Sequence, residues 1–273
     1  MPEGHVLHRL ARQLNEEFGG RAVEVTSPQG RFAREASLID GATLATAYAV
    51  GKHLFIEFTT TSGDTHVVYI HLGLIGSLRF EPAAEEWGQM RLHISNGTVA
   101  ANLRGPQACT LLSPPEVDAI IGKSGFDPLG PEADTPPDKL WEKVHASRRT
   151  IGSMLMDQKL FAGVGNIYRA EVLFRQGIGP QISGKTLSHE EFEAIWSDLV
   201  ELMRYGVEHG RIDTVRAAHS PEAMGRPPRK DDHGGEVYVY RRAGQPCHIC
   251  ATPIAGATVE GRKLYWCPGC QTN

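Results

Sequence analysis

The C-terminal end of the chain contains two closely spaced pairs of cysteines, and this spacing constrains the fold more than any other feature. Cys247 pairs with Cys250 and Cys267 with Cys270 in two C-x2-C motifs, with sixteen residues between them. This spacing is typical of four thiolates that bind one zinc ion. The residues between the pairs fit a hairpin with its turn at Gly261. We therefore expect a zinc ribbon with one structural Zn²⁺ per chain, because four thiolates leave no open position for water.

Disulfide bonds are the alternative use of these thiols. The chain has five cysteines, and no apolar signal segment follows its polar start, so the sequence does not support a secretory route. The fifth thiol, Cys109, is expected to be a small core residue rather than a nucleophile. No apolar run of the sequence reaches the length of a membrane span. We therefore expect a cytoplasmic protein that does not associate with membranes.

The pattern of apolar residues predicts two domains before the zinc ribbon. Residues 5–18 carry apolar positions at helical spacing, and Gly19-Gly20 ends this helix. Short stretches that look like strands follow, at 22–26, 53–59, 66–71, 77–80, 90–95 and 98–102, and helices are expected at 140–144, 151–160, 167–176 and 189–208. The predicted fold class is α+β: an N-terminal β-sandwich domain with a leading helix over 1–122, a linker over 123–139, a helical domain over 140–235 and a zinc finger over 236–273.

Proline and charge mark the connection between the two domains. The stretch from Ser113 to Leu140 contains six prolines, six acidic residues and two lysines, which predicts a solvated connector. Residues 1–140 hold 11 Lys and Arg against 17 Asp and Glu, and residues 141–273 hold 17 against 15. This mild asymmetry is a poor argument for nucleic-acid binding, because a solvated charged surface explains it equally well.

The N-terminus carries a candidate nucleophile. Removal of Met1 would give Pro2 a free secondary amine with the carboxylate of Glu3 beside it. An α-amino group titrates at about 7.7–8.0, so a useful fraction is unprotonated near neutral pH, whereas an ordinary lysine is not. A secondary amine that attacks a sugar C1′ forms an iminium without losing a further proton. The alternative is a frayed surface terminus with no role.

A glycine-rich turn in the helical domain is a candidate anion site. Gly163 and Gly165 break one helix, and Asn166 is placed to cap the next. Backbone amides at a helix N-terminus, an asparagine amide and nearby Lys159 suit a phosphate diester. A purely structural turn remains the alternative.

Taken together, these features resemble the formamidopyrimidine-DNA glycosylase and endonuclease VIII family of base-excision repair enzymes. The resemblance runs nearly end to end, and the motifs that carry it are Pro2-Glu3, Gly51-Lys52-His53-Leu54, His71-Leu72-Gly73-Leu74, Asp127-Pro128-Leu129-Gly130-Pro131, the run from Gln158 to Tyr168, and the hairpin region from Tyr240 to Gln271. The Gln158–Tyr168 run is similar to the family's helix-two-turn-helix. Gly4 resembles the endonuclease VIII branch, which favours oxidised pyrimidines.

The resemblance implies a bifunctional DNA glycosylase and AP lyase. Pro2 would displace the damaged base at C1′ and form a Schiff base, and Glu3 would protonate the sugar ring oxygen. Elimination of the 3′ and then the 5′ phosphate would cleave the strand. Lys52 matches the family's lysine near the active site, and Arg262, one residue past the hairpin turn, is expected both in the catalytic machinery and at the DNA backbone.

The resemblance also implies a set of DNA contacts. The residues that match the family's phosphate contacts are His71, Lys159, Asn166, Tyr240 and Arg262. Leu74 takes the position of the wedge that fills the stack after the damaged nucleotide is flipped out, and Arg104 resembles the arginine that pairs with the base opposite the lesion. Purely structural alternatives stay open. Lys52 could be a solvated lysine, His71 a strand histidine with all its hydrogen bonds made within the protein, and Leu74 a buried leucine.

The sequence departs from the family pattern in three places. Gly105-Pro106-Gln107 follows Arg104, so the usual aromatic partner is missing there. His5-Val6 stands where many relatives have a second glutamate. The loop at 211–235 lies where relatives carry a lesion-covering loop, and its basic run at 226–230 is either a phosphate-seeking strip or a solvated loop.

Three functions are therefore open. The first is a glycosylase and lyase for oxidised pyrimidines, the second is the same chemistry on oxidised purines, and the third is a zinc-ribbon DNA-binding protein without catalysis. The presence of Pro2, Glu3 and Lys52 together argues against the third. The expected partner is damaged DNA, duplex or single-stranded, bound by a monomer that works at the nucleoid of a bacterial cytoplasm.

Overall fold

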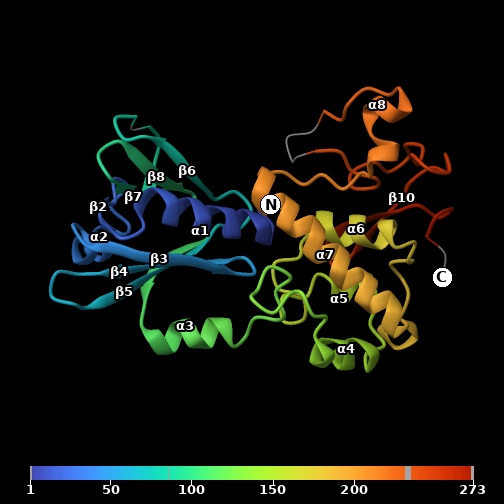
Figure 1. The fold of residues 1–273 in the computed structure, drawn as a ribbon, viewed down its shortest axis with the longest axis horizontal. Helices are drawn as coiled ribbons and strands as arrows, with labels where there is room; N and C mark the ends of the chain where they lie inside the picture. Colours follow the sequence, from blue (N-terminus) through green and yellow to red (C-terminus); the bar gives the residue numbers. More distant parts are fainter. Residues whose placement is uncertain (1, 86, 231–234, 272–273) are drawn as a thin grey trace. The chain divides into compact units, whose positions relative to one another are not determined.

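The computed structural model describes residues 2–85, 87–230 and 235–271, and the chain forms two compact units, Met1–Lys123 and Ser124–Asn273 (Figure 1). The first unit contains most of the β-structure, and the second contains a group of helices and a C-terminal hairpin. Within the described residues, no helix is long and apolar enough to cross a membrane.

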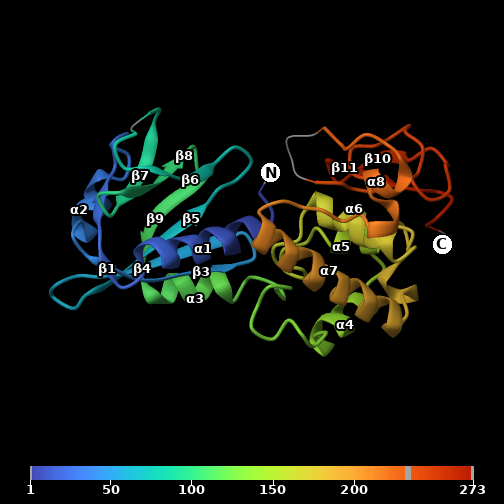
Figure 2. The same ribbon diagram turned by 45° about the horizontal axis from the view of Figure 1, so that its top comes forward.

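The N-terminal unit begins with helix α1 (Gly4–Phe18) and continues into two antiparallel sheets. The first sheet has the order β1-β3-β4-β5-β9 and the second the order β2-β7-β8-β6. Their strands are β1 (Arg21–Ala22), β2 (Glu24–Thr26), β3 (Thr43–Val50), β4 (His53–Thr59), β5 (Thr65–His71), β6 (Ser77–Pro82), β7 (Met90–Ser95), β8 (Val99–Arg104) and β9 (Ala108–Leu112). Helix α1 packs along β3, as both ribbon views show (Figure 2). The prediction of N-terminal sheets with a leading helix is confirmed.

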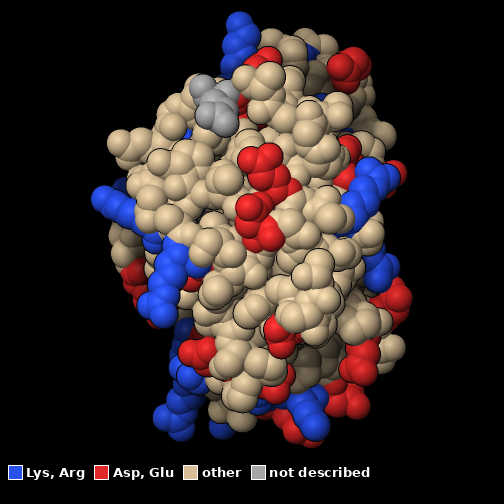
Figure 3. Space-filling model, turned by 90° about the vertical axis from the view of Figure 1, so that its left-hand side faces the viewer, with Lys and Arg blue, Asp and Glu red and all other residues tan. Residues whose placement is uncertain are grey.

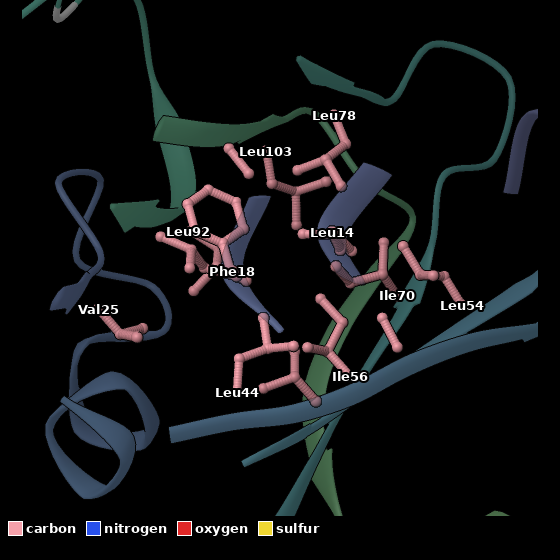
Figure 4. Close-up of a cluster of buried hydrophobic side chains, with 14 of the residues drawn as sticks. Leu14, Phe18, Val25, Leu44, Leu54, Ile56, Ile70, Leu78, Leu92 and Leu103 are labelled. Atoms are coloured by element: carbon pink, nitrogen blue, oxygen red, sulfur yellow. The ribbon is translucent and has the colours of Figure 1, made fainter. Parts of the chain in front are cut away.

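The core of this unit is formed by side chains from α1 and both sheets (Figure 4). Leu14 and Phe18 of α1 are fully buried, because apolar residues four positions apart lie on one face of a helix. Fully buried side chains of both sheets complete the cluster, among them Leu44, Ile56, Ile70, Leu92 and Leu103. This packing fixes the N-terminal end of α1, where Pro2 and Glu3 lie.

Two strands and two helices of this unit are absent from the sequence prediction. They are β3, β9, α2 (Ala33–Ile39) and α3 (Pro114–Ile121). Strand β3 is rich in alanine and lacks a clear alternation of apolar and polar residues, so its assignment depends on pairing with β4, from Thr43 opposite Thr59 to Val50 opposite His53. Where the local sequence signal for a strand is weak, its conformation depends on the strands that pair with it.

The proline-rich stretch from Ser113 to Leu140 is not the solvated connector that the sequence predicts. It begins with helix α3 (Pro114–Ile121), which a capping box between Ser113 and Glu116 stabilises. Val117 of this helix is buried against Phe55 and Val67 of the first sheet. Pro114 and Pro115 are compatible with this helix because they occupy its first turn, where no amide donor is needed.

The second half of that stretch packs onto the C-terminal unit. Phe126 donates its backbone amide to the Leu160 carbonyl at 2.9 Å, and its own carbonyl accepts from Ala162 at 2.9 Å. Ala133 is buried, and its carbonyl accepts a hydrogen bond from Trp196 Nε1 at 2.7 Å. Proline content therefore misled the prediction, because the stretch contains a helix and makes tertiary contacts at Phe126 and Ala133, although many of its other residues are exposed.

The C-terminal unit contains α4 (Asp138–His145), α5 (Ile151–Met154), α6 (Asn166–Arg175), α7 (His189–His209), α8 (Pro221–Met224) and a hairpin of β10 (Ala255–Val259) and β11 (Arg262–Trp266). Helix α5 ends six residues earlier than predicted. The Asp157 carbonyl accepts from both Leu160 and Phe161 beyond it, so the chain turns instead of continuing the helix. The long helix α7 starts with a capping box at Ser188 and ends at Gly210 in the left-handed conformation.

Candidate active site and nucleic-acid contacts

The N-terminal residues lie at the start of α1. Glu3 is 2% exposed and has an extended backbone at the N-cap position, and its carbonyl accepts from the Val6 amide at 3.0 Å. Pro2 is half-buried, and Met1 lies outside the described residues. Two residues on, His5 is buried, and burial lowers its pKa to about 4, with smaller effects from His8 and Arg9. The carboxylate of Glu3 is thus held in a largely water-excluded position beside Pro2.

Lys52 lies in the turn between β3 and β4, next to a pair of histidines. The rings of His53 and His71 are 5.4 Å apart, and His53 Nδ1 lies 2.8 Å from the Tyr69 hydroxyl. Burial lowers the pKa of His53 to about 4, and His71 and Lys52 lower it further. Burial and then Lys52 also lower the pKa of His71, against a hydrogen bond with Gln107. Lys52 and His71, which the sequence predicted as separate candidates, therefore lie in one cluster.

His71 has one ring nitrogen that could accept or donate to a ligand. Its Nδ1 is buried and has no hydrogen-bond partner among the described residues. A buried polar atom without a partner costs about 1–3 kcal/mol, so such atoms often mark binding sites. The alternative of a fully satisfied strand histidine does not describe this side chain.

Leu74 and Ile75 lie in the loop between β5 and β6 and are exposed. Leu74 is 68% exposed and Ile75 is 87% exposed. The alternative of a buried leucine is therefore wrong, and the loop presents two apolar side chains to solvent. Gly73 has φ +70°, and a Cβ there would meet the Gln107 side chain at 2.8 Å, so this position requires glycine.

Arg104, at the end of β8, is held by Glu81 and Trp87. Its Nη2 lies 2.8 Å from Glu81 Oε2, and its guanidinium carbon lies 3.8 Å from the centre of the Trp87 ring. Trp87 Nε1 donates to Glu81 Oε1 at 3.1 Å, and Asn102 donates to Glu81 Oε2 at 2.6 Å. An aromatic partner is therefore present, but it comes from the loop between β6 and β7 and not from the residues after Arg104. Sequence reasoning missed Glu81 and Trp87 because this contact spans seventeen positions or more.

The glycine turn before α6 is braced by a glutamine. The side-chain oxygen of Gln158 accepts from the Gly163 amide at 3.1 Å, and its Nε2 donates to the Val164 carbonyl at 2.9 Å. Asn166 does not cap α6 as predicted. Gly165 is the N-cap, and Asn166 Oδ1 accepts a hydrogen bond from Arg169 Nη2. The guanidinium of Arg169 donates to the side-chain oxygen that was expected to cap the helix, because Asn166 and Arg169 are neighbours on the helix surface.

Arg169 joins this turn to the C-terminal hairpin. It is 1% exposed, and its Nη2 also donates to the Lys263 carbonyl at 2.8 Å. Ser153 donates to Glu260 Oε1 at 2.7 Å, which ties α5 to the hairpin turn. Arg262 follows that turn, is exposed, and lines a cavity of about 300 Å³ together with Arg149, Asp157 and others. Lys159 is also exposed. Asn166 is therefore linked through Arg169 to Lys263, the residue that follows Arg262.

Tyr240 is positioned by a buried carboxylate that the sequence did not suggest. Glu171 of α6 is fully buried. It accepts hydrogen bonds from Thr214 Oγ1 at 2.6 Å and from the backbone amides of Tyr238, Val239 and Tyr240 at 2.7–2.9 Å. Tyr240 itself is 8% exposed, and its ring lies edge-on to Tyr265. Its predicted contact with phosphate is limited to the little of the side chain that is exposed.

The four cysteines of the hairpin region converge. Their sulfur atoms all lie within 4.8 Å of one another, with 3.8 Å between Cys247 and Cys270 and 3.4 Å between Cys250 and Cys267. A disulfide needs about 2.05 Å, so these thiols are not bonded in pairs. Four sulfurs at about 2.3 Å from a tetrahedral zinc ion are about 3.8 Å apart. The cluster therefore fits a closed four-thiolate metal site.

The charge on the surface is uneven. Figure 3 shows a face of the N-terminal unit with acidic side chains near its middle and, mixed with Lys and Arg, along its edges. Such a face does not favour a polyanion. The cationic candidates named above, Lys52, Lys159 and Arg262, lie in turns or at the ends of elements instead.

Comparison with known proteins identifies the family. The formamidopyrimidine-DNA glycosylase N-terminal domain model matches residues 1–105, and the H2TH domain model of the same enzyme matches residues 125–217. "Endonuclease 8 1" of Mycobacterium tuberculosis strain H37Rv is 43% identical over 281 residues, which cover all of both chains. The chain belongs to the formamidopyrimidine-DNA glycosylase and endonuclease 8 family.

More distant relatives and solved structures agree with this assignment. A formamidopyrimidine-DNA glycosylase of Rippkaea orientalis is 28% identical, with 99% of this chain and 100% of that protein covered. A complex of the LlFpg protein with a THF-DNA and an inhibitor has a TM-score of 0.78 at 23% identity, with 100% of both chains covered. A MutM complex with DNA that contains carbocyclic 8-oxo-G has a TM-score of 0.77 at 21% identity, also with 100% of both chains covered. These solved structures share the fold.

Members of the family are DNA glycosylases with AP lyase activity that act in base-excision repair. The prediction of a DNA-repair glycosylase and lyase is confirmed at this level. The helix-two-turn-helix region and the converging cysteines are confirmed as well.

Proposed function

We propose that this enzyme removes oxidised bases, pyrimidines in preference to purines, through a covalent bond between Pro2 and the sugar. We assign the chain to the endonuclease 8 branch because it is similar to an endonuclease 8 over its full length, at 43% identity. The buried carboxylate of Glu3 next to Pro2 supports the chemistry, because an acid excluded from water acts more strongly on a bound sugar.

The proposed reaction begins at the nitrogen of Pro2, after Met1 has been removed. The nitrogen lone pair attacks C1′, the damaged base leaves with the electron pair of its bond to C1′, and the proton on the Pro2 nitrogen passes to the departing base. Glu3 gives a proton to the ring oxygen, which opens the sugar and leaves an iminium between Pro2 and C1′. Loss of a 2′ proton expels the 3′ phosphate, and a second elimination expels the 5′ phosphate. Lys52 and Arg262 assist by stabilising the phosphates that leave.

The proposed DNA contacts combine phosphate binding with access to the base. His71, Lys159, Asn166, Tyr240 and Arg262 are assigned to backbone phosphates. The unpartnered Nδ1 of His71 and the exposure of Lys159 and Arg262 support this assignment. Leu74 is proposed to fill the stack, and its 68% exposure supports that role. Arg104 is proposed to contact the opposite base through Nη1, which has no hydrogen-bond partner among the described residues.

The zinc ribbon is proposed to be structural. Cys247, Cys250, Cys267 and Cys270 would hold one Zn²⁺ and so fix the hairpin that carries Arg262. The proposed location of the enzyme is the bacterial cytoplasm, at the nucleoid, where it would act as a monomer.

Borohydride trapping tests the proposal. The processed enzyme is incubated with duplexes that contain thymine glycol, 5-hydroxycytosine, 8-oxoguanine or an abasic site, and the iminium is reduced. We expect a covalent adduct with the first two lesions and the abasic site, lost in Pro2→Gly but retained in His8→Gln, a nearby change outside the proposed machinery.

Each other outcome contradicts a different part of the proposal. A preference for 8-oxoguanine would move the enzyme to the purine branch. DNA binding with no adduct on any duplex would leave only a binding protein. A single-stranded version of each substrate shows whether duplex structure is required.

A further inference from the structure

A glutamate at the tip of the C-terminal hairpin has a backbone conformation that is unusual for its residue type. Val259 pairs with Arg262, so Glu260 and Gly261 form the two-residue turn between β10 and β11. Both turn residues have positive φ, +50° at Glu260 and +74° at Gly261. Turns of this kind favour glycine, asparagine and aspartate, because other side chains are strained there. We therefore expect the side chain of Glu260 to make a contact that offsets this strain.

That contact is made with a buried serine of α5. Ser153 Oγ donates to Glu260 Oε1 at 2.7 Å, across 107 positions of the sequence. Ser153 is 5% exposed, and its Oγ also accepts from Arg149 Nη2 at 3.3 Å. Arg149 in turn forms an ion pair with Asp157 at 2.7 Å. Glu260 is thus attached to a connected set of polar groups outside the hairpin, although the residue itself is exposed.

The hairpin is attached to the helices on both sides of Arg262. Glu260 precedes Arg262 by two residues, and Lys263 follows it directly. The Lys263 carbonyl accepts from Arg169 Nη2 at 2.8 Å, so the chain is held by Ser153 before Arg262 and by Arg169 after it. Glu260 and Arg262 also line the same cavity of about 300 Å³. These contacts fix the backbone from which the exposed side chain of Arg262 starts.

The negative charge of Glu260 does not favour a polyanion. A carboxylate that shares a cavity with Arg262 repels a phosphate bound there. Loss of the charge alone should therefore strengthen DNA binding. Loss of the hydrogen bond with Ser153 should weaken DNA binding, because the turn that carries Arg262 is then no longer held. The two effects have opposite signs, so an experiment can separate them.

We propose that Glu260 is a positioning residue for Arg262. Its side chain, anchored on Ser153, fixes the turn so that the guanidinium of Arg262 is directed towards bound DNA. Glu260 itself does not touch the DNA. The inference rests on the phosphate contact proposed above for Arg262, and it adds the residues that set the direction of that side chain.

Three variants separate the anchor from the charge. Glu260→Ala removes both the carboxylate and the acceptor, whereas Glu260→Gln removes the charge and keeps an oxygen that accepts from Ser153. Ser153→Ala removes the donor and leaves the charge. Glu142→Ala removes an exposed carboxylate of α4 in the same unit and serves as the matched control. The affinity of each zinc-loaded enzyme for an undamaged duplex is measured from low to high salt, together with its zinc content.

We expect Glu260→Ala and Ser153→Ala to weaken DNA binding about fivefold, and to reduce the slope of log affinity against log salt by up to about one. Glu260→Gln should bind at least as tightly as the unchanged enzyme, because the anchor is kept and a repelling charge is lost. Ser153→Ala/Glu260→Ala should bind no more weakly than Ser153→Ala, since both changes break the same contact. The control should bind as the unchanged enzyme does, and zinc content should stay the same in all variants.

Unchanged or tighter binding by Glu260→Ala overturns the inference, because the carboxylate then acts only as a charge. Glu260→Gln that binds as weakly as Glu260→Ala also overturns it. Arg262→Ala distinguishes this failure from failure of the phosphate contact. A lower slope in Arg262→Ala without one in Glu260→Ala contradicts the positioning role alone, and an unchanged slope in Arg262→Ala contradicts both. Because the duplex is undamaged, the result does not depend on the Pro2 reaction.

Discussion

Replacement of Glu171 by glutamine should destabilise the C-terminal unit through the loss of one specific backbone hydrogen bond. Each carboxylate oxygen accepts two donors: Oε1 from the amides of Val239 and Tyr240, and Oε2 from Tyr238 and Thr214. Glutamine can keep its oxygen on the amides of Val239 and Tyr240 and donate its NH₂ group to the Thr214 hydroxyl, which can turn to accept, so only the Tyr238 amide loses its acceptor. A hydrogen bond to a charged acceptor contributes about 1.5–3 kcal/mol, so the expected loss is about 1.5–3 kcal/mol.

Urea unfolding followed by tryptophan fluorescence measures this loss. Trp141, Trp196 and Trp266 lie in the C-terminal unit and Trp87 in the other, so the signal reports mainly on the unit that changes. A loss of this size is measurable against the roughly 5–15 kcal/mol that stabilises a typical domain. Glu142→Gln, an exposed position on α4, is the matched control and should change stability by less than 0.5 kcal/mol. A loss below about 1 kcal/mol in Glu171→Gln would refute the reasoning.

Three further predictions concern the metal, the backbone contact and pH. Cys267→Ser should lower the bound zinc, measured by metal analysis, and weaken DNA binding, because the hairpin then no longer fixes Arg262; full binding without zinc would count against a structural metal. Arg262→Ala should reduce the salt slope of DNA affinity by about one, and an unchanged slope would show that it does not touch phosphate. Because the pKa of His53 is lowered to about 4 from 6.5, stability should fall as pH drops from 6.5 towards 4, and His53→Gln should flatten that dependence of the urea midpoint.

The sequence predicted well those features whose signal is local or covalent. The cysteine spacing fixed the zinc-ribbon region, and the sulfur atoms of Cys247, Cys250, Cys267 and Cys270 converge as expected. Strands β4 and β7 were predicted to the residue, because apolar residues of each strand are flanked by glycine or asparagine turns. The predicted helix at 189–208 agrees with α7 to within one residue. Ser188 caps the start of this helix and Gly210 caps its end.

The errors arise where tertiary contacts decide the structure. Prolines at 114 and 115 indicated a connector, but they occupy the first turn of a capped helix that packs on the first sheet. Asn166 looked like a helix cap, but the guanidinium of Arg169 occupies its oxygen. Helix α5 was extended too far because its sequence continues with good helix formers, while backbone bonds at Asp157 turn the chain.

The residues that complete the candidate sites were hardest to find from the sequence. Trp87 approaches Arg104 from another loop, and Glu171 collects three backbone amides that lie 67 to 69 positions away. A buried carboxylate and a stacked indole have no sequence signature, since their role depends on the groups that the fold brings to them. Contacts such as Trp87 with Arg104 can be found only when the coordinates of both residues are known.

The most direct test of the central claim is the location of the bond between enzyme and DNA. The processed enzyme is trapped with borohydride on an abasic duplex and digested, and the modified peptide is sequenced by mass spectrometry. The account predicts that the reduced sugar is attached to the nitrogen of Pro2 in an N-terminal peptide that lacks Met1. Attachment to Lys52 or any other lysine, with an unmodified N-terminal peptide, would contradict it.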